Sequence, residues 1–317
     1  MHGVVFRVAA TEYTWQDVLD WGHRQGEWSD HVREVREGVA ALALARESGE
    51  PPEDDVRVAA AAFRRRHRLI SAEDTERWLA ERRISVAAWM DHVRRSLARD
   101  RQRERVSGLG PDAEGSAVEE LQLWTAGVCS GLYPNFAIAL AERVAAAEAW
   151  AETGPGAGPA GDRWDALEAA SIAFRAAAAT DRAVAEEVLA RRLDWIDLDL
   201  EWVSFPEEAT AREALLCLRE DGDFSAALFS GDTPASGRRR ARLCDFEAEL
   251  RPTLIGARTG DAIGPARMAG GWRVTRVLSR RVPAEGDEEV RRRAVAAVQA
   301  RAVRREVERR VRWHVRY

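Results

Sequence analysis

The segment Gly260-Asp261-Ala262-Ile263-Gly264-Pro265, followed by Gly270-Gly271-Trp272-Arg273-Val274-Thr275-Arg276-Val277, is the most informative stretch of the chain. The glycines and the proline of its first part favour turns, because glycine accepts positive φ values and proline fixes φ. Val274 and Val277 lie in a short run that can pair as a β-strand. The stretch therefore predicts turns that lead into a strand.

Residues 194–205, further upstream, alternate between apolar and mostly acidic side chains. The apolar positions are Ile196, Leu198, Leu200 and Trp202, and between them stand Asp197, Asp199, Glu201 and Val203. A period of two is typical of a strand with one buried face. A helix is predicted to follow from Pro206 to Asp221, ended by Gly222-Asp223-Phe224.

This order of elements resembles a parvulin, the PpiC-type prolyl isomerase domain, over residues 196–283. In that family a helix ends in G-x-F or A-D-F, as at Phe224, and a loop G-E-x-x-G-P leads into a final strand G-Y-H-I-I-x-V, as at 260–277. Ser230-Gly231-Asp232 resembles the S-x-D loop of the family. The resemblance implies a small α+β domain that binds peptides at X-Pro bonds.

Two positions depart from the family pattern. The paired histidines of the parvulin pocket correspond here to Trp202 and Arg273, and the G-G-D-L-G segment is missing near 236–240. An arginine does not exchange a proton near neutral pH as imidazole does, so no catalytic residue is predicted. A guanidinium in an apolar groove can still hold a backbone carbonyl or a carboxylate.

The predicted site is therefore a peptide-binding one. Its expected residues are Trp202, Arg273, Trp272, Phe224 and Asp232. Two alternatives remain open: Arg273 as a surface residue of the strand in an ion pair, and residual prolyl isomerase activity.

The N-terminal third is predicted to be helical, with a break near Gly22 to Gly26. Asp54 is expected to open one helix, Ser71 with Asp74 forms a weak capping box for the next, and Ser85 caps a third. The arrangement resembles the chaperone region of SurA- and PrsA-type foldases over residues 30–100. The segments that carry it are Ala45–Gly49, Phe63–His67, Leu79–Ile84 and Trp89–Arg95.

The same helical pattern repeats after a Gly- and Pro-containing linker at Ser107 to Ser116. The segments at 26–28 and 39–41 have counterparts at 131–133 and 144–146, an offset of 105, and Phe63-Arg64 has one at Phe174-Arg175. A second Gly/Pro segment, Thr153 to Gly161, interrupts the second copy. The repeat predicts a duplicated helical unit, and chance similarity among Ala- and Arg-rich helices is the alternative.

The expected fold class is mainly α, with duplicated SurA-like units, a small α+β parvulin-like domain and a returning C-terminal helix. The predicted segments are 1–106, 107–195, 196–283 and 284–317. The last segment is predicted to be a helix from Glu285 to Trp313 that packs on the helical region, as in SurA-like proteins.

Composition limits the classes of function. The net charge is −5, which argues against nucleic-acid binding, and all 48 basic residues are arginines, which excludes Schiff-base chemistry through lysine. The three cysteines are far apart and are expected to be reduced thiols. No apolar run of about 20 residues and no secretory signal are present, so no membrane contact and a cytoplasmic location are expected.

Two carboxylate- or histidine-containing patterns have a metal interpretation. His23, Glu27 and His31 are spaced like helical ligands, and Asp197, Asp199 and Glu201 alternate along one strand. A solvated face is the simpler interpretation of both, so no metal and no cofactor are predicted. Most of the twelve tryptophans are expected in the core, and the others can line a peptide groove.

The combined pattern is similar to PpiC-related proteins of peptide maturation systems in actinobacteria. That similarity implies a peptide-binding chaperone or escort, whose partners are a ribosomally made natural-product precursor peptide and other maturation enzymes. The alternative is a repurposed enzyme, metal-dependent or not, that modifies the peptide.

Overall fold

The computed structural model describes most of the chain and divides it into two compact units. The described residues are 3–107, 118–154, 162–221, 235–246, 248, 250–268, 270–284 and 286–315. Unit 1 comprises Met1–Phe174 and Val303–Tyr317, and unit 2 comprises Arg175–Ala302. The boundaries between the units, at residues 174/175 and 302/303, fall inside two helices. They differ from the bounds of the four segments predicted from the sequence, and that division into four stays a prediction.

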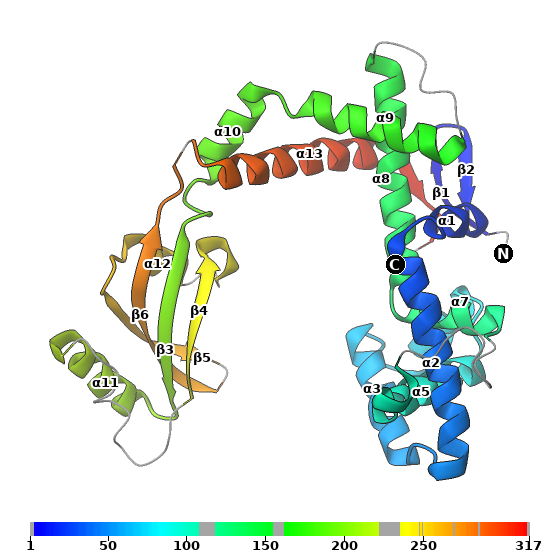
Figure 1. The fold of residues 1–317 in the computed structure, drawn as a ribbon, viewed down its shortest axis with the longest axis horizontal. Coiled ribbons are helices and arrows are strands. Elements are labelled where there is room, and N and C mark those ends of the chain that lie inside the picture. The colour runs from blue at the N-terminus through cyan, green and yellow to red at the C-terminus, as the bar shows by residue number, and fades with distance from the viewer. Residues whose placement is uncertain are drawn as a thin grey trace. The chain divides into compact units, whose positions relative to one another are not determined.

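Unit 1 is mainly helical. Its elements are β1 (Val4–Val8), β2 (Thr11–Thr14), α1 (Trp15–Gly22), α2 (Gly26–Ser48), α3 (Glu53–Arg66), α4 (Ala72–Glu81), α5 (Val86–Arg101), α6 (Arg103–Val106), α7 (Glu120–Cys129), α8 (Leu132–Thr153), most of α9 (Arg163–Ala178) and β7 (Val311–Trp313) (Figure 1).

Unit 2 combines helices with a four-stranded sheet. Its elements are α10 (Asp181–Arg191), β3 (Asp197–Phe205), α11 (Glu208–Asp221), β4 (Ser236–Arg242), the 3₁₀ turn η2 (Leu243–Asp245), α12 (Arg251–Gly256), β5 (Ala262–Met268), β6 (Gly271–Arg281) and most of α13 (Glu288–Arg310). The structure thus confirms the mainly α fold class, with two small antiparallel sheets.

Capping residues determine where several helices of unit 1 begin. The predicted box is present at Ser71, whose side chain accepts from the N–H of Asp74 while the Asp74 carboxylate accepts from the N–H of Ser71. Ser85 caps α5 as predicted. The helix predicted to open at Asp54 is present but begins one residue earlier, at Glu53, and no side chain caps it; Asp54 lies in its acidic first turn, where a carboxylate suits the helix dipole.

The first sheet has the order β2-β1-β7 and was not predicted. Residues 311–313, expected as the end of the last helix, leave α13 and pair with Phe6–Val8 of β1. Phe6 and Val8 are fully buried there, so the burial of β1 outweighs three more residues of helix. The C-terminal segment also joins α8, because Arg310 donates two hydrogen bonds, of 2.7 and 2.6 Å, to the Glu152 carboxylate.

The helix bounds agree with the predicted duplication, which stays a hypothesis. Shifting α1 and α2 by 105 residues gives 120–127 and 131–153, close to the bounds of α7 and α8. The packing is reciprocal, since α1 lies against α8 and α2 lies against α7. Their shared core contains Val18, Trp124, Tyr133 and Leu140, all nearly or fully buried.

The second sheet has the order β4-β3-β6-β5 and is antiparallel. The predicted alternation in β3 is confirmed: Leu198 and Leu200 pack on the α12 side, and Val203 and Phe205 pack on the α11 side. The prediction of a turn at Gly264-Pro265 was wrong, because this cis pair lies within β5 at an irregularity in its pairing. An edge strand tolerates proline, since one side of it needs no N–H donor.

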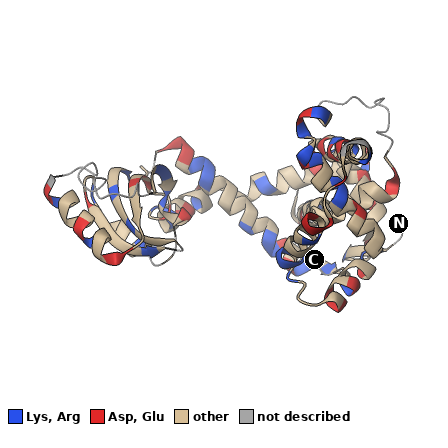
Figure 2. Ribbon diagram, turned by 90° about the horizontal axis from the view of Figure 1, so that it is seen from below, with Lys and Arg blue, Asp and Glu red and all other residues tan. Residues whose placement is uncertain are grey.

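Charged residues are spread over both units. Basic and acidic segments alternate along the helices (Figure 2).

In unit 2 the buried carboxylate of Glu187 on α10 pairs with Arg301 of α13 and lies 2.8 Å from Nε of Arg191. Within the described ranges, no helix combines the length and apolar character that crossing a bilayer requires.

Candidate peptide-binding pockets

The predicted site residues Trp202 and Arg273 line one small cavity in unit 2, which we call the Trp202 pocket. Its volume is about 120 Å³. The sheet supplies the floor and the segment from η2 through α12 supplies the wall. The lining residues are Leu200, Trp202, Arg239, Asp245, Phe246, Leu250, Leu254, Ile263, Ala266, Met268, Arg273 and Thr275.

The alternation of strands explains why these side chains meet. Trp202 is two residues beyond Leu200 on β3, and Thr275 is two residues beyond Arg273 on β6, so all four face the α12 side. Trp202 stands opposite Thr275 on one neighbouring strand and opposite Gly237 on the other. A Cβ at Gly237 would lie 2.7 Å from Cζ2 of Trp202, so glycine makes room for the indole.

Arg273 and Trp202 form a stacked pair. The guanidinium carbon lies 4.2 Å from the centroid of the indole ring, a cation–π contact, and Nε lies 3.4 Å from Oγ of Ser204. The interpretation of Arg273 as a strand residue in an ion pair is not what the structure shows: no ion pair of Arg273 is found within the described part of the chain. Its neighbour Arg276, on the opposite face, holds Glu201 at 2.8 Å.

A second guanidinium and one carboxylate complete the lining. Arg239 lies 5.5 Å from the ring of Phe246. The pKa of Asp245 lies below its usual value, mainly because the carboxylate accepts a hydrogen bond from the N–H of Arg242. The pocket therefore offers an apolar floor with both donors and an acceptor at its boundary.

Trp272, a third predicted site residue, does not line this pocket. Trp272 packs on the opposite face of the sheet, beside Val203, Phe205 and α11, because adjacent residues of a strand point to opposite faces. Phe224 and Asp232 lie outside the described residues. No pattern in the sequence points to Phe246, Leu250 or Met268, which also line the pocket. Thr275 has a sequence signal, because it stands two residues after Arg273 on the same strand and so faces the same side.

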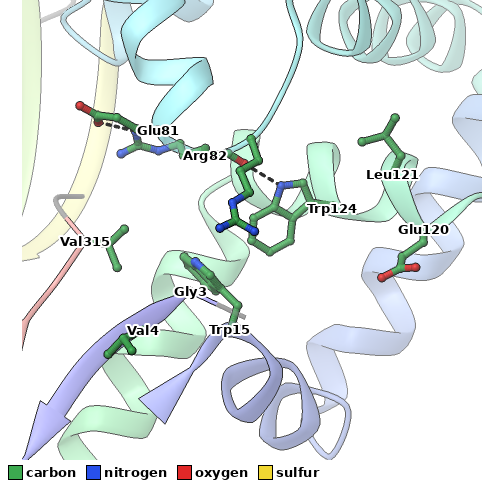
Figure 3. Close-up of a pocket in the computed structure, with 10 residues that line it drawn as sticks. Gly3, Val4, Trp15, Glu81, Arg82, Glu120, Leu121, Trp124 and Val315 are labelled. Atoms are coloured by element: carbon green, nitrogen blue, oxygen red, sulfur yellow. Dashed lines mark hydrogen bonds and ion pairs between the residues drawn. The ribbon is translucent and has the colours of Figure 1, made fainter. Parts of the chain in front are cut away.

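Unit 1 contains a larger cavity, which we call the Trp15–Trp124 pocket (Figure 3). Its volume is about 420 Å³, and it is lined by Gly3, Val4, Trp15, Glu81, Arg82, Arg83, Glu120, Leu121, Trp124 and Val315. The two indoles meet edge to face with centroids 5.2 Å apart. Leu121 beside them is 51% exposed, so an apolar surface faces solvent here.

Hydrogen bonds fix the polar side of this pocket. Nε1 of Trp124 donates to the carbonyl of Arg82 at 2.9 Å, as the dashed line in Figure 3 shows. The Arg82 guanidinium stacks on Trp78 at 4.2 Å and donates to the Trp78 carbonyl. The pocket is thus preorganised, with tryptophan faces, which agrees with the expectation that some tryptophans line a groove.

The residues of the two candidate metal patterns, all of them described, do not form a ligand cluster. His31 is buried with Nε2 3.2 Å from the Leu123 carbonyl, while the ring of His23 lies edge-on to Trp28. The strand carboxylates instead hold arginines of the neighbouring strands: Asp197 with Arg281, Asp199 with Arg238, and Glu201 with Arg276. Among the described residues, no three His, Cys, Asp or Glu side chains gather as a metal site.

Comparison with protein-family models finds no match to the chain. Comparison with curated proteins finds no similar one either.

Proposed function

We propose that the chain is a peptide-binding escort, which holds an extended segment of a client peptide at the Trp202 pocket. The observation that carries this proposal is the Arg273 guanidinium stacked on Trp202 beside an apolar cavity. A cavity of about 120 Å³ is close in size to cavities that hold one small ring, since an engineered apolar cavity of ~150 Å³ binds benzene. One apolar side chain or a proline ring is therefore a suitable occupant.

The charged groups of the pocket suit a peptide backbone. A guanidinium that is held by stacking loses little freedom when it binds a carbonyl, because its planar donors are already oriented. Arg273 and Arg239 supply donors, and Asp245 supplies an acceptor for an amide N–H. The Trp15–Trp124 pocket of unit 1 supports the same class of ligand, because aromatic anchors dominate peptide contacts.

The proposal also includes the ancestry of the chain and the kind of client peptide it binds. The parvulin- and SurA-like patterns of the sequence favour a foldase ancestry, and the similarity to peptide maturation proteins favours a ribosomally made precursor peptide, handed on to other maturation enzymes. Prolyl isomerisation is expected at background rate, since neither Trp202 nor Arg273 exchanges a proton near neutral pH.

Binding of a labelled peptide tests the proposal. The probe is a fluorescein-labelled decapeptide with a central Leu-Pro pair, compared with the same peptide with serine in place of the proline. Arg273→Met is expected to weaken binding about tenfold, the equivalent of about 1.4 kcal/mol. Arg276→Met is the matched control, because it lies on the same strand with its side chain on the opposite face.

Two outcomes would contradict the proposal. One is the absence of saturable binding by the unmodified protein to either peptide. The other is an equal loss for Arg273→Met and Arg276→Met, which would point to the sheet rather than to the pocket. The mass of the recovered peptide is measured in the same samples, and a changed mass would favour the peptide-modifying enzyme instead.

A further inference from the structure

A buried arginine in unit 1 has guanidinium nitrogens without acceptors. Arg95 on α5 is 5% exposed. Its Nε lies 3.0 Å from the carboxylate of Asp91, one turn earlier, but makes no hydrogen bond of good geometry with it. Its Nη1 is buried and finds no hydrogen-bond partner among the described residues. A buried charged group in this state is costly, so the site calls for a further acceptor.

Arg95 lines a cavity of about 260 Å³, which we call the Arg95 cavity. The cavity lies between α2, α3, α5 and α7. The charged and titratable groups on its lining are Arg66, Arg95, Arg99, His31, His92, Glu34 and Cys129. The lining thus has three guanidinium groups and one carboxylate, that of Glu34, which already pairs with Arg99 at 3.2 Å; the Asp91 carboxylate beside Arg95 is not part of the lining.

Neighbouring polar groups do not accept hydrogen bonds from the buried Nη1 of Arg95. The hydroxyls of Ser96 and Ser130, which also line the cavity, donate to the main-chain carbonyls of His92 and Gly127. The C-terminal end of α7 reaches the cavity at Cys129, and its dipole favours a nearby cation. No described carbonyl of that end accepts a hydrogen bond from Nη1 of Arg95.

The titration of His92 agrees with a positive interior. Burial, and then the positive charges of Arg95 and Arg99, lower the pKa of His92 to about 4. The neutral ring leaves the three arginines as the cationic groups of the cavity near neutral pH. A negatively charged occupant would relieve both the unpaired donors and the repulsion among these groups.

We propose that the Arg95 cavity binds one small oxyanion, a phosphate or a carboxylate, through Arg95, with Arg66 and Arg99 nearby. The planar fork of a guanidinium matches two oxygens of either group. The proposal concerns a different pocket from the peptide-binding one, so each can fail without the other.

Calorimetric titration of the full chain tests this inference. Inorganic phosphate and sodium acetate are the two probes, each in a chloride buffer of matched ionic strength. One site per chain is expected for at least one probe, and which of them binds tells a tetrahedral phosphate site from a carboxylate site. Arg95→Met is expected to weaken binding at least tenfold. Arg143→Met is the matched control, since Arg143 is a partly buried arginine of unit 1 that pairs with Glu168 and does not line the cavity.

A second variant covers the case in which Arg95→Met does not fold. Arg99→Gln, at a side chain that is 28% exposed, is expected to weaken binding several-fold while the fold is retained. Proton NMR of His92 is expected to show its titration moved to higher pH when the anion is bound. No saturable heat with either probe would overturn the proposal. Binding that neither Arg95→Met nor Arg99→Gln changes would overturn it too.

Discussion

At the residue scale, the exclusive use of arginine has structural consequences. Guanidinium groups stack on tryptophan rings at Arg82 with Trp78, Arg143 with Trp21, and Arg273 with Trp202. Lysine would not reproduce these contacts, because its ammonium has no planar face. Two of these arginines line pockets: Arg273 lines the Trp202 pocket and Arg82 lines the Trp15–Trp124 pocket.

Protonation of His92 is expected to destabilise unit 1. Its pKa in the folded chain is about 4, against an ordinary 6.5. As the pH falls from 7 to 4 the unfolded chain takes up this proton first, so the free energy of unfolding decreases. The expected loss is roughly 1–3 kcal/mol, and most of it is reached near pH 4, where the folded ring also takes up its proton.

Urea unfolding at pH 7, 6, 5 and 4 measures this effect. His92→Gln is expected to flatten the dependence between pH 6.5 and 4. His23→Gln is the control, at an exposed ring, and is expected to keep the dependence of the unmodified protein. Superimposable curves for His92→Gln and the unmodified protein would show that His92 is not the responsible group.

At the element scale, ion pairs fix which faces of the secondary structure meet. The carboxylates of β3 pair with arginines on β4 and β6. The row of carboxylates, for which a metal ion was one interpretation, therefore binds guanidinium groups of the same sheet. Cross-strand pairs of opposite charge stabilise a sheet by less than about 1 kcal/mol each. They favour this register over alternatives that would place like charges opposite each other.

Two consecutive glutamates of α10 are expected to differ sharply in their effect on stability. Glu187 has a side chain 2% exposed and pairs with Arg191 and Arg301, whereas Glu186 is 64% exposed and pairs with Arg182. Glu187→Gln is expected to lower the free energy of unfolding by roughly 1–3 kcal/mol, because two arginines lose their shared partner. Glu186→Gln is expected to change it by less than about 0.5 kcal/mol.

Thermal unfolding of both variants provides the comparison. Hydrogen exchange in α10 and in the first half of α13 is expected to rise only for Glu187→Gln. Equal behaviour of the two variants would mean that apolar contacts, such as Val184 with Val290, hold these helices together without the ion pair.

At the scale of the whole molecule, the chain leaves unit 1 and returns to it. Residues 303–315 complete unit 1, where β7 pairs with β1 and Val307 and Val311 join the main core. The last residues of the chain are therefore needed for a unit whose first strand begins at Val4. A returning C-terminal helix was predicted; the strand that follows it was not.

A charge in β7 is expected to destabilise unit 1 and to spare unit 2. Val311 is 5% exposed, and Val311→Asp is expected to cost about 3 kcal/mol, because a carboxylate would be buried without a partner. The control is Val282→Asp, at a residue of unit 2 that is 40% exposed. Hydrogen exchange resolved by segment is expected to increase in β1 and α8 but not in β3 and β6. Faster exchange in both units would show that they unfold as one.

The elements with the strongest local signals were predicted from the sequence. These elements are the helix caps at Ser71 and Ser85, the break near Gly22 and the alternation in β3. Each depends on residues that are close in sequence, so a local pattern is enough to predict it. β1 was missed because a short strand is stable only with its partners, and one partner lies some 300 residues away in sequence. Of the expected site, Trp202 and Arg273 line one pocket, whereas Trp272 lies on the opposite face of the sheet, because adjacent residues of a strand point to opposite faces.

The sequence by itself determined the mainly helical class, the capped helix starts at Ser71 and Ser85, and the alternation in β3, because periodicity and capping are properties of adjacent residues. Tertiary structure alone decided the pairing of β7 with β1, the two pockets and the buried state of Arg95. Arg95 stands beside Arg94 in an arginine-rich helix, and the pattern does not tell them apart. Only packing against α2 and α7 removes Arg95 from water, and burial is what changes the energy of its unpaired donors.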